Sequence, residues 1–121
     1  MNDDDLAAGF ERGTLATFPH ESHVRTVFVL VRRYGEVDAL ARLKAGIRAL
    51  AIRAGKLDKY HDTRTVAWFN LIVAQMGDEP DSTTFLERNP QFLRRDLLDD
   101  HYTPALLNSP QARETWIAPN R

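Results

Sequence analysis

Apolar residues recur at three- and four-residue steps between Glu36 and Ala54, and this is the clearest pattern in the chain. Such a period gathers them into one stripe along an α-helix. Gly55 follows directly and predicts the end of the helix. Gly46 is unfavourable inside a helix by about 1 kcal/mol relative to alanine, so we expect another helix to cross closely there. The stripe consists of Val37, Leu40, Leu43, Ile47, Leu50 and Ala54.

A second apolar segment precedes this one and begins near Pro19, a residue that suits the first turn of a helix. The run 27–31 is rich in valine and could form a strand by itself. Signals on both sides favour a helix, since Arg32 and Arg33 suit its last turn and Gly35 suits its end. Because only Gly35 separates the two apolar segments, we expect them to form a helical hairpin.

A third helix is predicted from Thr63 to Met76, with Asp62 as its N-cap and a wide apolar face typical of a helix packed on two sides. Beyond Gly77 the apolar runs become short, and three of them follow a capping residue and a proline. These features predict short helices over 82–88, 90–100, 104–107 and 110–117. The expected fold is therefore all-α: a helical hairpin plus a third long helix, wrapped by several short C-terminal helices.

Residues 1–16 show no sustained apolar period. They combine the acidic tract Asp3-Asp4-Asp5 with glycines and scattered apolar residues, which predicts a flexible or loosely docked arm. The remaining residues, 17–121, have an ordinary size for one domain, and we expect them to form a single helical domain.

Composition narrows the function classes. A net charge of −1 provides no field that would attract nucleic acid or an anionic membrane, so we expect neither partner. No apolar run approaches the roughly 18 residues of a membrane span, and the acidic N-terminus is unlike a basic secretory signal; we therefore expect a soluble, cytoplasmic protein. The absence of cysteine excludes disulfides, thiolate metal sites, iron–sulfur clusters and a cysteine nucleophile.

Three of the four histidines lie at the starts of two predicted helices, His20 and His23 on one and His61 on the other. Two histidines three residues apart share one helix face, so all three imidazoles converge if those two faces meet. Three neutral imidazoles suit zinc or iron, with an open position for water or a small-molecule substrate. The alternative is that they bond only to backbone and water at helix starts. His101 lies among carboxylates and is left out of the site.

Three polar residues next to His61 are candidates for supporting roles. Tyr60 is a candidate acid or substrate hydrogen-bond donor, or else a packed aromatic. Asp62 is a candidate ligand or an acceptor that orients His61, or else a simple N-cap. Thr65 lies one helical turn beyond His61. A metal-free site is also open, in which one histidine acts as general base and Tyr60 positions the substrate.

Four segments of the chain, at 18–24, 32–35, 59–63 and 102–113, resemble a family of small uncharacterised bacterial proteins. The family pattern is aromatic-x-His-x-x-His-Leu followed by Lys-Tyr-His-Glu-Thr. The likeness runs from about residue 18 to the C-terminus, with Val24 in place of leucine and Asp62 in place of glutamate. It implies a site at His20, His23 and His61, but no reaction. The segments are Phe18-Pro19-His20-Glu21-Ser22-His23-Val24, Arg32-Arg33-Tyr34-Gly35, Lys59-Tyr60-His61-Asp62-Thr63 and Tyr102-Thr103-Pro104-Ala105-Leu106-Leu107-Asn108-Ser109-Pro110-Gln111-Ala112-Arg113.

Two functional hypotheses follow. The first is a small metal-dependent enzyme or metal-binding protein that uses the three histidines as ligands, with Tyr60 and Asp62 beside them. The second is a non-catalytic interaction or regulatory module, which would form a homodimer through Trp68 and Leu71 or bind a partner. Neither hypothesis specifies a substrate.

Overall fold

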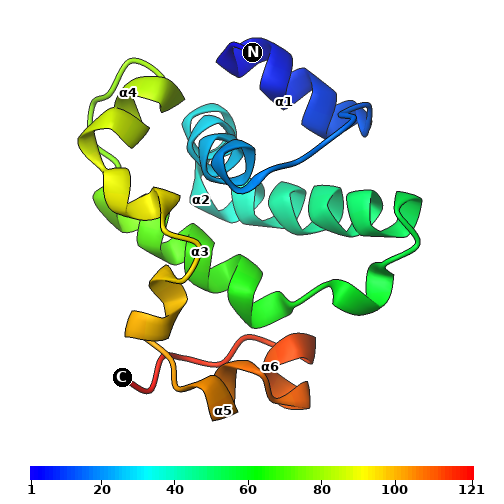
Figure 1. The fold of residues 1–121 in the computed structure, drawn as a ribbon. Coiled ribbons are helices and arrows are strands. Elements are labelled where there is room, and N and C mark those ends of the chain that lie inside the picture. Colours follow the sequence, from blue (N-terminus) through cyan, green and yellow to red (C-terminus); the bar gives the residue numbers. More distant parts are fainter.

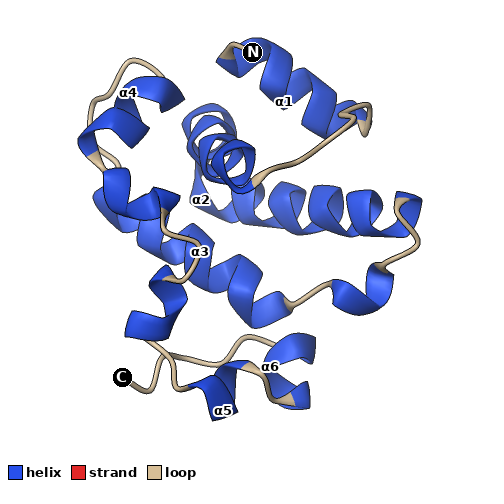
Figure 2. Ribbon diagram, viewed as in Figure 1, coloured by secondary structure: helices blue, strands red, loops and turns tan.

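The computed structural model describes all residues, 1–121, and contains helices, turns and loops but no strand, which confirms the predicted all-α fold (Figure 2). None of the helices combines the length and apolar character needed to cross a membrane. In chain order the helical elements are α1 (Asp3–Arg12), α2 (His20–Arg53), the 3₁₀ turn η1 (Leu57–Lys59), α3 (Asp62–Gln75), α4 (Ser82–Arg88), the 3₁₀ turns η2 (Pro90–Leu93) and η3 (Leu97–Asp100), α5 (Pro104–Leu107) and α6 (Pro110–Glu114).

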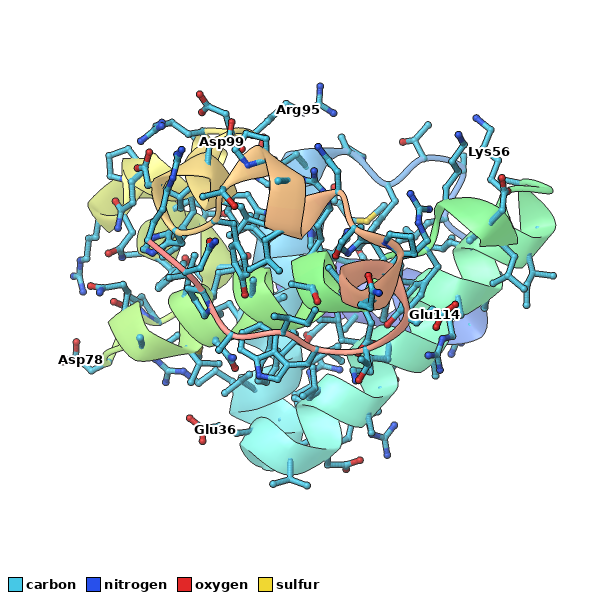
Figure 3. The ribbon with its side chains drawn as sticks, turned by 90° about the horizontal axis from the view of Figure 1, so that it is seen from below. Glu36, Lys56, Asp78, Arg95, Asp99 and Glu114 are labelled. Atoms are coloured by element: carbon cyan, nitrogen blue, oxygen red, sulfur yellow. The ribbon has the colours of Figure 1, made fainter.

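Helix α2 contains a sharp break at Gly35, the joint predicted between the first two helical segments. Gly35 has φ 79° and ψ 170°, a conformation that residues with a side chain rarely adopt. The two segments, 20–34 and 36–53, therefore run in different directions from an elbow next to Glu36 (Figure 3). In Figure 1 the first segment is seen end-on and the second lies across the view.

The segment expected to be a flexible arm is instead a helix, α1, which packs on α2 (Figure 1). Asn2 caps it by accepting a hydrogen bond from the backbone N–H of Asp5. Its core contacts come from Leu6, Ala7 and Phe10, each at most 2% exposed. Three apolar residues are too few to show a period along the sequence, but they form one face of a three-turn helix.

Gly46 has the role expected from its position in an otherwise favourable helix, because it allows another helix to approach closely. The ring of Phe10 in α1 lies against the Gly46 backbone, and a Cβ atom there would overlap that ring. The unfavourable helix propensity of glycine is thus the cost of docking α1 on α2.

Helix α3 lies between the second segment of α2 and the C-terminal helices (Figure 1), as its wide apolar face predicted. The predicted caps Thr103 and Ser109 both accept backbone N–H bonds, from Leu106 and Ala112 respectively. The predicted helix 90–100 consists instead of two separate 3₁₀ turns, η2 and η3.

The last residues do not continue the helix predicted over 110–117; α6 ends at Glu114 and the chain becomes extended at Thr115. This extended segment is held on the start of α3 by Thr63. The Thr63 hydroxyl donates to the Thr115 carbonyl at 2.9 Å and accepts from the Ile117 N–H at 3.1 Å. Two backbone bonds to a fully buried threonine therefore fix the C-terminal segment across the N-terminal end of α3.

Candidate functional site

One cavity lies where the first turns of α2 and α3 meet, and the three predicted histidines all line it. His20 is the first residue of α2, and His61 is the residue that precedes α3. The volume is about 330 Å³, within the range of small-molecule pockets. We call this cavity the histidine pocket. Its lining consists of Phe18, His20, His23, Ile47, Lys59, Tyr60, His61, Arg64, Thr65, Trp68 and Arg95.

His61 uses both ring nitrogens to hold the structure together. Its Nδ1 accepts from the Arg64 backbone N–H at 3.1 Å, so His61, and not Asp62 as predicted, is the N-cap of α3. Its Nε2 donates to the Leu107 carbonyl at 2.7 Å. Because a carbonyl only accepts and an N–H only donates, these partners fix the neutral Nε2–H tautomer. Burial also lowers the pKa of His61.

One ring nitrogen of His20 is hydrogen-bonded to the backbone, and the other has no partner within the chain. Its Nε2 lies 2.7 Å from the Phe92 carbonyl, to which it donates. Phe92 is positioned by stacking on Phe85, whose ring in turn packs on Phe28 of α2. The His20 ring meets the Trp68 indole edge-on, with centroids 4.6 Å apart. With Nε2 bonded to Phe92, Nδ1 is the ring nitrogen left for another partner.

His23 is the least satisfied of the three imidazoles. Its Nε2 is fully enclosed and has no hydrogen-bond partner. Burial, followed by the nearby His20 ring, lowers the pKa of His23 from its ordinary 6.5 to about 4. Its ring centroid is 6.3 Å from that of His20 and 5.9 Å from that of Phe18. Buried polar atoms are nearly always paired in folded proteins, so the unpaired Nε2 of His23, a residue that lines the cavity, is an exception.

Tyr60 and Asp62, the predicted catalytic pair, are bonded to each other. The Tyr60 hydroxyl donates to Asp62 Oδ1 at 2.9 Å, and Lys44 forms an ion pair with the same carboxylate at 3.2 Å. Burial and this hydrogen bond raise the pKa of Tyr60 to about 12, so the phenol stays protonated. Asp62 does not line the histidine pocket, and His61 is oriented by the Leu107 carbonyl instead of this carboxylate.

Thr65, predicted to support the site, does line the pocket, but its hydroxyl donates to the His61 carbonyl at 2.9 Å. Trp68 was predicted to take part in a dimer surface. It is only 5% exposed and packs against His20, so it belongs to the core and to the pocket wall. Trp68 is therefore not exposed for the homodimer contact expected from Trp68 and Leu71, and a homodimer stays a prediction.

The side chains do not form a ligand set for a metal as they stand: no group of three or more histidine and carboxylate residues is placed to share an ion. In addition, both ring nitrogens of His61 have backbone partners. Ligation by His61 would require one of these bonds to break. The predicted three-histidine metal centre stays a prediction.

The charged lining of the pocket was not anticipated from the sequence. Lys59, Arg64 and Arg95 come from η1, from α3 and from the loop after η2, and no carboxylate lines the cavity. Only Arg64 carried a usable signal, because its position three residues after His61 puts it on the same side of α3. Lys59 and Arg95 are brought to the pocket by the path of the folded chain.

Comparison with protein-family models, with curated proteins and with solved structures finds no match to this chain. The resemblance to a bacterial family with the two histidine segments stays a prediction, and the function must be argued from the pocket itself.

Proposed function

We propose that the protein binds a small molecule in the histidine pocket, and that the imidazoles of His20 and His23 contact it directly. The observation that carries the proposal is the enclosed, unpaired Nε2 of His23. Burying a polar atom without a partner costs about 1–3 kcal/mol, and no group of the chain is hydrogen-bonded to this nitrogen. A bound molecule with one hydrogen-bonding group would supply the partner.

The chemistry available to such a site is proton transfer without a metal. His20 offers a lone pair on Nδ1 while its Nε2–H is fixed on Phe92, the arrangement of a general base held by a backbone carbonyl. His23 is too weakly basic for that role near pH 7, because its pKa is about 4, and it acts as a neutral hydrogen-bonding group. Tyr60 positions the pocket wall through Asp62 and is not itself a proton donor.

A nuclear magnetic resonance screen with small aromatic fragments tests this proposal, because the chain provides internal controls. It has two tryptophans and four histidines. Trp68, His20 and His23 line the pocket, whereas Trp116 and His101 line a different cavity. We expect at least one fragment to shift the Trp68 indole N–H and the two histidine ring signals saturably. Shifts confined to Trp116 and His101, or no saturable shift at all, would contradict the proposal.

A metal ion is the second candidate, and the same unpaired His23 Nε2 favours it together with the nearby His20 ring. In that case His20 and His23 would be the ligands of a zinc or iron ion, joined by His61 only after it released a backbone bond. A metal there would supply Lewis-acid activation of a bound molecule.

Elemental analysis of protein purified without a histidine tag separates the two candidates. The metal-free proposal predicts far less than one metal ion per chain, with no change in His20→Ala. The metal candidate predicts close to one ion per chain, lost in His20→Ala and retained in His101→Ala. The second result would replace the first proposal.

A further inference from the structure

The geometry points to an anion as the ligand: we infer that the molecule bound in the histidine pocket carries a carboxylate or phosphate group next to a flat apolar body. This inference rests on the proposed small-molecule site and adds its chemical class. It is argued from the charges around the pocket, from the two helix ends that meet there and from the composition of the inner wall.

The pocket carries three cationic side chains and no carboxylate. None of the three, Lys59, Arg64 and Arg95, forms an ion pair or a side-chain hydrogen bond. Other basic side chains of the protein are paired with acidic groups: Arg25, Arg32, Arg33, Arg42, Lys44, Arg88 and Arg94. Of the acidic residues that adjoin the lining in sequence, Asp62 is paired with Lys44 and Asp96 with Arg94, and neither Glu21 nor Asp58 lines the pocket. Cations gathered around one opening without counterions raise the local concentration of anions.

Two helix N-termini add to this charge. The first segment of α2 begins at His20 and has no side-chain cap, because the residue at its cap position is Pro19. Helix α3 begins directly after His61. Both ends carry the positive pole of a helix dipole, which favours an anion, although the Arg64 N–H in the first turn of α3 is already bonded to His61. Glu21 and Asp62 lie in these first turns, but neither lines the pocket.

The inner wall is apolar and aromatic. Phe18, Ile47 and Trp68 line the cavity between the histidines, while Lys59, Arg64 and Arg95 are exposed at its rim. The Arg95 side chain extends from the surface and is not held by any neighbour, so it can turn onto a bound group (Figure 3). A ligand with a charged head at the rim and a flat body against Trp68 matches this division, and His23 also lines the cavity.

Three matched probes test the inference: benzoate, phenyl phosphate and benzamide, the last being a neutral amide of the same shape as benzoate. Each is titrated into the full-length protein while the Trp68 and Trp116 indole signals are followed. We expect both anions to move Trp68 saturably and to bind about tenfold or more tightly than benzamide. The tighter of the two anions identifies the head group as carboxylate or phosphate.

The variant Arg64→Gln should weaken binding of the anions by about tenfold and leave benzamide unchanged. Lys56→Gln is the matched control, because Lys56 is an exposed cation close in sequence that does not line the pocket (Figure 3). Benzamide binding as tightly as the anions would overturn the anion inference while leaving the pocket proposal intact. Failure of all three probes to move Trp68 would overturn both.

Discussion

Acidification from pH 7 to pH 4 should lower the free energy of unfolding by about 3 kcal/mol through His23 alone. Burial, aided by the His20 ring, lowers the pKa of His23 from 6.5 to about 4. Between these values the unfolded chain binds a proton that the folded chain does not. Stability therefore falls as the pH drops through 6.5 and levels off below about 4. Burial also lowers the pKa of His61, which adds a loss of the same sign.

Urea unfolding at constant ionic strength over this pH range measures the loss, and His23→Leu isolates its cause. The variant should lose much less stability toward pH 4 than the wild type. Two exposed carboxylates have lowered pKa values and act mainly below this range: the Thr84 N–H holds the pKa of Asp81, and Arg94 that of Asp100, below the ordinary 3.8. Their stabilisation is lost only at lower pH. A wild-type curve that stays flat from pH 7 to pH 4 would contradict a buried, neutral His23.

At pH 7 the same variant should be as stable as the wild type or up to about 1 kcal/mol more stable, since it removes a buried atom without a partner. It should nevertheless lose the binding of any molecule that contacts His23. A substitution that maintains folding and removes binding distinguishes a functional residue from a structural one. Loss of both together would mean that His23 serves the core.

The sequence predicted the fold well where one local pattern decides the structure. The helix over 36–53, the break at Gly35 and the caps at Thr103 and Ser109 each depend on neighbouring residues. The two ends of the apolar stripe were predicted less well, because Val37 is 88% exposed and Ala54 is exposed beyond the helix. Prediction from the sequence failed where an element depends on a contact with residues distant in the chain. Helix α1 is defined by the docking of Phe10 on Gly46, thirty-six residues later, and no local period reveals that contact.

In the histidine pocket, too, the sequence predicted what depends on local spacing and not what depends on distant contacts. Helical spacing predicted that His20 and His23 share a face, and both line the pocket with His61. The role of each imidazole could not be predicted, because it depends on carbonyls that arrive from Phe92 and Leu107. These two bonds come from the C-terminal part of the chain. They leave only His23 without a partner, which changes the expected metal ligands into groups with three different roles.

The variant His61→Ala should lower the free energy of unfolding by about 3 kcal/mol in metal-free buffer, because His61 has two structural partners. Loss of the cap on the Arg64 N–H costs about 1 kcal/mol. The Leu107 carbonyl then loses its donor. Because Leu107 is only 1% exposed, this loss costs about 1–3 kcal/mol more. The free energy of unfolding of His61→Asn should lie between those of the wild type and His61→Ala, since asparagine can cap the helix but does not reach Leu107.

Denaturant unfolding of these variants beside His101→Ala decides whether His61 is structural. His101 makes no side-chain hydrogen bond, so its replacement should change stability by less than about 0.5 kcal/mol. If His61→Ala matched that control and lost a bound metal instead, His61 would be a ligand and its two backbone bonds would be dispensable. If it unfolds more easily and still shows fragment shifts at Trp68, then His61 supports the pocket from behind, and the contacts with the ligand are left to His20 and His23.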